Sequence, residues 1–410
     1  MTSAPTSQAP TADDPRVSLR IRNGSAVFLV SLVGLMMANL APLIMSVFEQ
    51  VGFDVVTSGN ILTWGLFASA VVGLGTSRAA AGAHRRTIAA VGLIVAAVGF
   101  GCAAIVVHPA LVVTSFIIGS VGVGTAISTS GAAIAALKNP NRVSATSGVV
   151  NRLLVMVVLA VIPLLGLAQI TLFGALTLLS LLSLAVTVWL PSTPEFSTID
   201  LVAESAAEPR RAPRKVLLAG IGVLIVFPLW GTSEDAVWTL APVLGEAVGL
   251  SEQSLGFTLS AAAGVGAGAM LIVTLGGRRI GRAVPLGIAL LLGGATKIWI
   301  GLTDDPQTLA ILIIVVNTIY AFAFVLFLAT AAGLDARGYW SGPLIGAYIV
   351  GSSFAPVIGA WIIDSVGISA FGVAMGIVNF VLIIPTVLIA RVSTGVERTL
   401  NHLGEESPTH

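Results

Sequence analysis

Two adjacent carboxylates, Glu234 and Asp235, stand inside an otherwise apolar run that covers residues 216–242. An ionised acid near the centre of a bilayer costs about 2.5–3.5 kcal/mol on insertion scales. A membrane protein retains such a residue where it faces a cavity, finds a partner or carries a proton. We therefore interpret Glu234 and Asp235 as candidate proton-coupling residues. The alternative is that both lie in water at the outer end of this span.

Arg152 is a second embedded charge, in the apolar run 145–166. It lies about eight residues from the inner end of that run, which corresponds to ~12 Å of helix. Because an arginine is not neutralised in proteins, it requires an anionic ligand, a carboxylate partner or a path for its side chain to reach water. Two interpretations lead: Arg152 binds an anion, or it forms a fixed ion pair with Glu234 or Asp235.

Lys297 is the other embedded cation, in the apolar run 283–302. It lies near the outer end of this run, close in sequence to Asp304 and Asp305. A lysine in such a place can extend its alkyl chain along apolar surface and keep its ammonium group in water. We expect Lys297 to do so.

Four neutral side chains inside apolar runs are candidates for substrate binding beside Arg152: Trp238, Asn39, Asn317 and Tyr320. Trp238 follows Glu234 by four residues and therefore shares its helix face. The amides and the phenol can hydrogen-bond a substrate, or they can join helices to one another.

Three prolines predict breaks in the spanning helices: Pro42, Pro228 and Pro242. Each lacks the N–H that a helix needs and clashes with the carbonyl four residues earlier. Broken helices at membrane depth are tolerated where they line a cavity, so these prolines mark candidate cavity-lining segments.

The composition indicates a membrane protein. Only 10% of the 410 residues are charged and 56% are hydrophobic, whereas soluble domains carry about 25% charged residues. The mean hydropathy is +1.00. The one cysteine, Cys102, excludes an internal disulfide and cysteine-rich metal clusters. The four histidines are scattered, so we expect no metal site, no cofactor and no enzymatic activity, and nothing indicates a nucleic-acid partner.

Runs and breakers together predict an all-α protein with twelve transmembrane helices. The first six spans cover about 25–47, 57–77, 87–107, 110–136, 145–166 and 169–190, and the last six about 216–242, 255–275, 283–302, 307–332, 341–363 and 368–390. The predicted domains are an N-terminal tail (1–22), a six-helix bundle (23–190), a polar linker (191–215), a second six-helix bundle (216–391) and a C-terminal tail (392–410).

The distribution of Lys and Arg predicts the orientation. With the N-terminus in the cytoplasm, every Lys and Arg except Arg152 and Lys297 falls in a cytoplasmic loop or tail, and the outer loops hold acids only. This asymmetry is the one that the positive-inside rule requires. We therefore predict a multi-pass protein of the cell membrane with both termini in the cytoplasm.

The two halves repeat each other. Leu40-Ala-Pro42 in the first span matches Leu240-Ala-Pro242 in the seventh, and Val51-Gly-Phe matches Val248-Gly-Leu. Ser147-Gly and Pro163-x-x-Gly in the fifth span match Ser341-Gly and Pro356-x-x-Gly in the eleventh. Six spans repeated in one orientation form parallel repeats about an axis along the membrane normal.

This arrangement resembles the major facilitator superfamily over residues 22–391. The loop after the second span keeps the Arg85–Arg86 pair of the family's loop motif, and the duplicate loop keeps Arg279-Ile-Gly-Arg282. The resemblance implies that these four arginines belong to gating loops. It also implies that spans one, five and ten line a central cavity.

The resulting prediction is a secondary active transporter, proton-coupled, that moves a small organic compound by alternating access. An organic anion bound by Arg152 is the favoured substrate. The alternative is a proton-driven exporter of amphipathic cations. A non-transporting receptor or scaffold is the least favoured hypothesis. The expected partners are the substrate, protons and the lipid bilayer. The oligomeric state is left open, with a monomer as the simplest form.

Overall fold

The computed structural model describes residues 17–138, 140–191, 213–276, 281–334 and 340–405. In these ranges the chain is helical apart from turns and one isolated β-bridge between Val17 and Leu137. The predicted N-terminal tail and linker fall largely outside the described residues. The helices are α1 (Ile21–Asn39), α2 (Ala41–Val51), α3 (Val55–Ala81), α4 (Arg85–Ile105), α5 (Pro109–Ala135), α6 (Pro140–Leu164), α7 (Gln169–Val186), the short 3₁₀ helix η1 (Thr187–Trp189), α9 (Arg214–Thr239), α10 (Ala241–Ala247), α11 (Glu252–Gly276), α12 (Ala283–Leu302), α13 (Pro306–Ala332), α14 (Ser341–Ser353) and α15 (Ala355–Glu405).

Eleven helical stretches in the described residues are long and apolar enough to cross a membrane. The last of them, Pro343–Glu397, contains two crossings, because Gly367 interrupts α15 with φ 86° and ψ 169°. The first and seventh crossings are each built from two helices, α1 with α2 and α9 with α10. The predicted all-α fold with twelve crossings is therefore confirmed.

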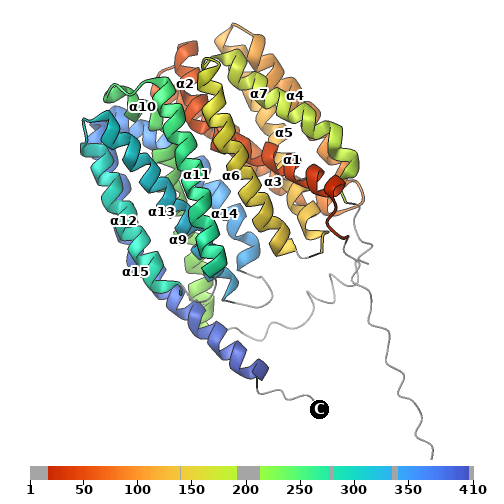
Figure 1. Ribbon diagram of the computed structural model, residues 1–410, viewed down its shortest axis with the longest axis vertical. Helices are drawn as coiled ribbons and strands as arrows, with labels where there is room; N and C mark the ends of the chain where they lie inside the picture. Colours follow the sequence, from red (N-terminus) through yellow and green to blue (C-terminus); the bar gives the residue numbers. More distant parts are fainter. Residues whose placement is uncertain (1–16, 139, 192–212, 277–280, 335–339, 406–410) are drawn as a thin grey trace, which may run out of the picture.

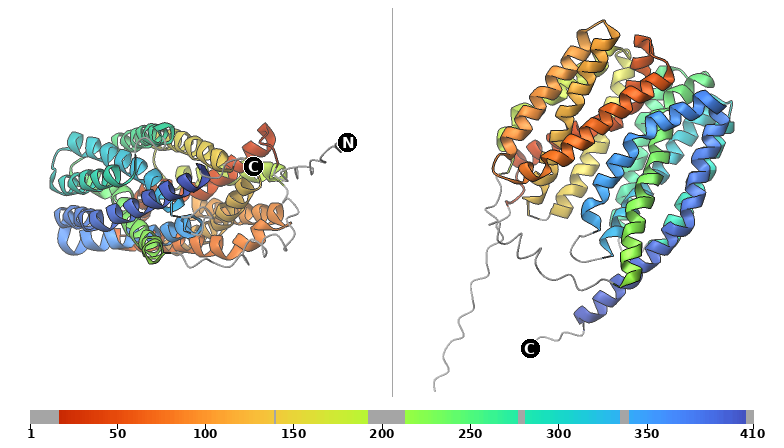
Figure 2. Two further views of the ribbon diagram at one scale, coloured as in Figure 1. Left: turned by 90° about the horizontal axis from the view of Figure 1, so that it is seen from below. Right: turned by 180° about the vertical axis from the view of Figure 1, so that it is seen from behind.

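The helices form two groups that lie side by side (Figure 1): α1 to α7 on one side and α9 to α15 on the other. Figure 2 shows the same division from behind. The groups meet along two seams, α6 against α11 and α3 against α14 and α15. Glycine permits the close approach at both seams, because a Cβ at Gly256 would collide with Pro163 and one at Gly59 would collide with Pro356.

The helix breaks at the two Leu-Ala-Pro segments have the same backbone geometry. Leu40, between α1 and α2, has φ −91° and ψ 8°, and Leu240, between α9 and α10, has φ −92° and ψ 9°. The missing N–H of Pro42 and Pro242 accounts for both breaks. The predicted break at Pro228 is wrong: α9 runs through this residue to Thr239. Gly351 packs directly against the Pro228 ring, so the ring lies in a helix contact and not at a gap in the helix.

The α2 and α10 helices meet at the end of the bundle opposite the end of α15 (Figure 1). Both end in a left-handed glycine, Gly52 with φ 106° and Gly249 with φ 76°. The N–H of Gly52 donates to the carbonyl of Glu49, and that of Gly249 donates in the same way to the carbonyl of Glu246. The repeat therefore places two equivalent acids at this contact between the halves.

Glu49 lies in the last turn of α2, after the predicted first span (about 25–47) and outside the spanning helix Ile21–Asn39. Its Oε1 atom is buried without a hydrogen-bond partner among the described residues. Burial, followed by the charge of Glu246, raises the pKa of Glu49 to about 7. The folded protein therefore holds a proton there that an unfolded chain would already have released.

This proton predicts how stability depends on pH. The folded state binds more protons than the unfolded state between the ordinary carboxyl pKa and about 7, so the unfolding free energy falls as the pH rises through that window. Glu49→Gln should flatten the decline of the melting temperature between about pH 5 and about pH 7, measured in detergent. The exposed Asp304→Asn variant is the control. An equally steep decline in Glu49→Gln would contradict the assignment.

Gly367 provides a test of the turn between the last two crossings. Its φ and ψ lie in a region that is essentially accessible only to glycine, where another residue costs about 1–3 kcal/mol. A Cβ at Gly367 would meet nothing within 4 Å, so the loss in Gly367→Ala would come from the backbone alone. Thermal unfolding should show a lower melting temperature for Gly367→Ala. Gly174→Ala, at a helical glycine that is equally free of contacts, should not lower it.

Candidate functional site

A buried ion pair joins α9 to α12. The ammonium group of Lys297 lies 2.8 Å from Oε1 of Glu234, and the two side chains are 0% and 3% exposed. The interpretation of Glu234 as an acid in water at the end of its span is therefore wrong. Two opposite charges withdrawn from water are stable together only if their remaining hydrogen-bonding positions are also filled.

Two polar neighbours fill those positions. Lys297 Nζ also donates to Ser233 Oγ at 2.8 Å and to Asn379 Oδ1 at 3.1 Å, which uses all three ammonium hydrogens. Asn379 Nδ2 donates in turn to Glu234 Oε1 at 3.3 Å. A Cβ at Gly293, one turn before Lys297, would lie 2.8 Å from Asn379 Nδ2. Gly293 therefore provides the room that the network occupies.

The expectation that Lys297 extends to water is wrong for an identifiable reason. The buried face of α12 includes Leu286, Leu290, Gly293 and Ile300, and Lys297 continues this face at helical spacing. The lysine therefore points toward α9 and α15. Nearness in sequence to Asp304 and Asp305 says nothing about which way the side chain leaves the helix.

Asp235 belongs to a separate chain of hydrogen bonds. Tyr348 in α14 donates from its hydroxyl to Asp235 Oδ2 at 2.8 Å. The same hydroxyl lies 2.8 Å from that of Tyr320 in α13, where either oxygen can be the donor. Asp235 and Tyr320 are partly exposed, and Tyr348 is buried. Among the described residues, no lysine or arginine forms an ion pair with Asp235.

Arg152, from the other half of the molecule, contacts the hydrogen-bond chain formed by Asp235, Tyr348 and Tyr320. Its Nη1 donates to Asn317 Oδ1 at 3.2 Å, and its guanidinium carbon lies 5.6 Å from the centre of the Tyr320 ring. Arg152 is 9% exposed. The alternative of a fixed ion pair with Glu234 or Asp235 is wrong, because no described acid lies within ion-pair distance of the guanidinium and Glu234 is paired with Lys297.

Rings pack around this polar chain. Trp230 stacks on Tyr320 and on Phe227, with ring centres 5.4 and 5.8 Å apart, and Phe227 lies 4.9 Å from Tyr348. These rings come from α9, α13 and α14. The result is an apolar wall beside Asp235 and Arg152.

The remaining candidates for substrate binding lie at the helix breaks. Trp238 Nε1 donates to the backbone carbonyl of Asn39 at 3.2 Å, a contact between the halves. The amide of Asn39 itself donates to Leu35 in its own helix. The structure therefore joins Asn39 to Trp238 through the backbone, and it places Arg152, Asn317 and Tyr320 together in one group.

The loop arginines bind the ends of neighbouring helices. Arg85 donates to the carbonyl of Pro191 and Arg86 to that of Leu190, after the sixth crossing. Arg282 forms an ion pair of 2.7 Å with Glu397 in the extension of the twelfth. Arg279 lies outside the described residues. A gating role for these four arginines stays a prediction.

Sequence reasoning missed Ser233, Tyr348 and Asn379. Asn379 carried a signal, since it is an amide inside the apolar run 368–390. Tyr348 is one of only three tyrosines and stands in the eleventh span. Neither residue could be paired with a partner, because the pairs join helices that are far apart in the sequence.

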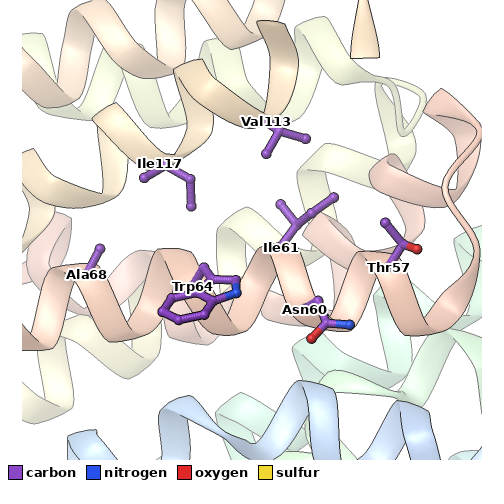
Figure 3. A pocket seen from close by; sticks show the side chains of 7 residues that line it. All are labelled: Thr57, Asn60, Ile61, Trp64, Ala68, Val113 and Ile117. Carbon is purple, nitrogen blue, oxygen red and sulfur yellow. The ribbon is translucent and has the colours of Figure 1, made fainter. Parts of the chain in front are cut away.

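A groove of about 410 Å³ lies elsewhere, between α3 and α5 (Figure 3). Its lining is apolar apart from Thr57 and Asn60. None of the predicted site residues lines it. In the described part of the chain, no three His, Cys, Asp or Glu side chains gather as a metal site would require.

Comparison with known proteins gives a family match. The family model of the Major Facilitator Superfamily matches residues 26–335. Solved structures of similar fold include a D-xylose–proton symporter (TM-score 0.66, 15% identity, 91% of this chain and 96% of that chain) and a POT family transporter in complex with a thioalcohol-conjugated peptide (0.67, 14%, 92% and 96%). A third is the human organic anion transporter MFSD10, with a TM-score of 0.62 and 16% identity over 89% of this chain and 99% of that chain. No curated protein matches the chain in sequence.

The ion pair between Glu234 and Lys297 can be tested by a double-mutant cycle. Lys297→Met leaves an uncompensated buried carboxylate and should cost about 3–5 kcal/mol of stability. Adding Glu234→Gln removes that charge and should recover most of the loss, giving a large favourable interaction energy in thermal or denaturant unfolding. Additive losses from the two substitutions would show that the side chains do not form a pair.

Proposed function

Because the chain belongs to the major facilitator superfamily, we propose that it is a secondary active transporter that moves a small organic anion, coupled to protons. Membership of this family makes it a membrane transporter and not an enzyme. The anion would bind at Arg152, at the contact between the two halves. Binding between the two repeats is what alternating access requires.

One observation carries the proposal: Arg152 is a buried cation whose partners among the described residues are neutral. A buried charge is costly unless it is paired. Asn317 satisfies one of the five N–H donors of the guanidinium, and the Tyr320 ring contributes a weaker cation–π attraction. Such a site gains most from a ligand that brings its own negative charge, and a carboxylate fits the fork of the guanidinium.

The surroundings of Arg152 favour an anion with an apolar or aromatic body. The rings of Phe227, Trp230 and Tyr320 lie on one side of the polar chain. Phe227 and Trp230 are themselves buried, so the ring of the partly exposed Tyr320 is the surface that they support from behind. Apolar substrate surface that packs on this ring leaves water, at roughly 25 cal/mol per Å². The carboxylate would then bind Arg152 while the body of the substrate packs against Tyr320.

The two acids would have different roles. The charge of Glu234 is matched by Lys297, so we assign this pair to holding α9, α12 and α15 together. Asp235 lacks a cationic partner among the described residues and remains partly exposed, so we assign the coupling proton to Asp235. A proton entering with the electrical gradient supplies about 2.3 kcal/mol per 100 mV.

The export of amphipathic cations remains the second candidate. The same Asp235, next to the aromatic wall, could attract a cation through its charge and through cation–π contacts. We favour the anion because Arg152 would repel a cation in the same space.

We further propose that the end of the bundle carrying Arg85, Arg86 and Arg282 faces the cytoplasm of a cell membrane. This orientation places both termini inside the cell. We also propose that the two predicted bundles, residues 23–190 and 216–391, are the units that move against each other.

A ligand screen by thermal stability distinguishes the two substrates. A bound ligand at 100 times its Kd stabilises the folded protein by about 2.7 kcal/mol. Carboxylates should stabilise the wild type, and Arg152→Ala should weaken their binding about 10- to 100-fold through loss of a charge-assisted hydrogen bond. Without ligand, Arg152→Ala should melt no lower than the wild type, because it removes an unpaired buried charge.

Two controls accompany this screen. The exposed Arg78→Ala variant should bind carboxylates as the wild type does. Arg152→Lys should recover only part of the affinity, since a lysine cannot form the bidentate contact. Stabilisation by cationic amphiphiles alone, abolished in Asp235→Asn, would reject the anion and support the exporter.

A further inference from the structure

The two tyrosine hydroxyls connect the proton site to the substrate site. Tyr348 touches Asp235 Oδ2 on one side and the hydroxyl of Tyr320 on the other, at 2.8 Å in each case. Arg152 covers the ring of Tyr320. An anion held by Arg152 therefore comes close to the ring whose hydroxyl ends the chain.

Each hydroxyl has one hydrogen, and this limits the directions of the bonds. When Asp235 is ionised, Tyr348 donates to the carboxylate, and Tyr320 must then donate to Tyr348. When Asp235 is protonated, its own O–H can donate to Tyr348. Tyr348 then donates to Tyr320, and the hydrogen of Tyr320 is free to point elsewhere.

We propose that Tyr348 and Tyr320 form a reversible hydrogen-bond chain through which protonation of Asp235 strengthens anion binding at Arg152. This inference rests on the proposed function. Protonation of Asp235 turns both hydroxyls, and Tyr320 gains a free donor for the anion. No proton passes along the chain: each hydroxyl keeps its own hydrogen and rotates, and the proton taken from water stays on Asp235. Tyr348 and Tyr320 are thus positioning residues.

The groups around Asp235 support an effect of its protonation that acts through the two tyrosines. The charged and titratable groups near it are Tyr348 from α14, Tyr320 from α13, Arg152 from α6 and Glu234 from its own helix. Glu234 is paired with Lys297 of α12, and α15 contributes the neutral amide of Asn379. The acids of α2 and α10, Glu49 and Glu246, lie beyond the helix breaks.

The geometry also explains why two tyrosines are needed. Asp235 lies on α9 and Arg152 lies on α6, in the other half. A single hydroxyl would reach the carboxylate but not the ring beside the guanidinium. The pair crosses from α14 to α13, and α13 is the helix that contacts Arg152.

The test is the pH dependence of binding of benzoate, an aromatic carboxylate that stays ionised over the range used, to the purified full-length protein. Wild type should bind it about tenfold more tightly at about pH 5.5 than at about pH 8, which corresponds to ~1.4 kcal/mol. Tyr348→Phe and Tyr320→Phe should each keep binding that depends on Arg152 but bring the ratio close to one. Asp235→Asn should bind tightly at both values, since its amide can donate to Tyr348.

The control is Phe324→Leu, which alters the ring packing beside both tyrosines but removes no hydroxyl. It should keep the wild-type ratio. If both tyrosine variants keep the full ratio while Asp235→Asn loses it, the carboxylate acts through space by charge alone and the proposal is overturned. If the wild type shows no binding that depends on Arg152 at either pH, the proposed function fails, and this inference fails with it.

Discussion

The buried ion pair between Glu234 and Lys297 constrains the second half of this protein more than any other contact in the described residues. Hydrocarbon does not solvate a carboxylate or an ammonium group, so each charge must be met inside the bundle. To pair these charges, α9, α12 and α15 must present Glu234, Lys297 and Asn379 at one depth and on facing sides. The pair therefore fixes the register of three helices. It also leaves Asp235, one residue away, without an ion-pair partner among the described residues.

The two halves have the same backbone arrangement but carry different side chains at equivalent positions. Aligning the two Leu-Ala-Pro segments places Gly34 and Leu35 where the second half has Glu234 and Asp235. Gly34 packs tightly on Ile127, so the first half uses this position for helix packing. Its one embedded charge is Arg152. Under the proposed function, the second half would supply the acid and the first half the cation, and the two meet through Tyr320.

Under the proposed alternating access, contacts between the two halves would change, whereas contacts within one half would not need to. The Glu234–Lys297 pair lies within one half and can survive a rigid-body motion. The contact of Arg152 with Asn317, that of Trp238 with the backbone of Asn39, and the meeting of α2 with α10 all cross between halves. A substrate that replaces Asn317 as the partner of Arg152 would change a contact on which the relative position of the halves depends.

The sequence by itself determined the twelve crossings, the repeat and which charged residues lie inside apolar segments. Hydrophobic length, the Leu-Ala-Pro breaks and the embedded positions of Glu234, Asp235, Arg152 and Lys297 are local properties, because hydrocarbon thickness and the cost of burying charge act on each segment separately. Only the tertiary structure decided the pairing. Arg152 was the cation considered as a partner for Glu234, and Lys297 was expected to reach water; which cation pairs with Glu234 depends on which helix faces which, a relation between segments more than sixty residues apart. The same reason explains the missed roles of Tyr348 and Asn379, and the continuity of α9 through Pro228, where packing against Gly351 outweighs the local preference for a break.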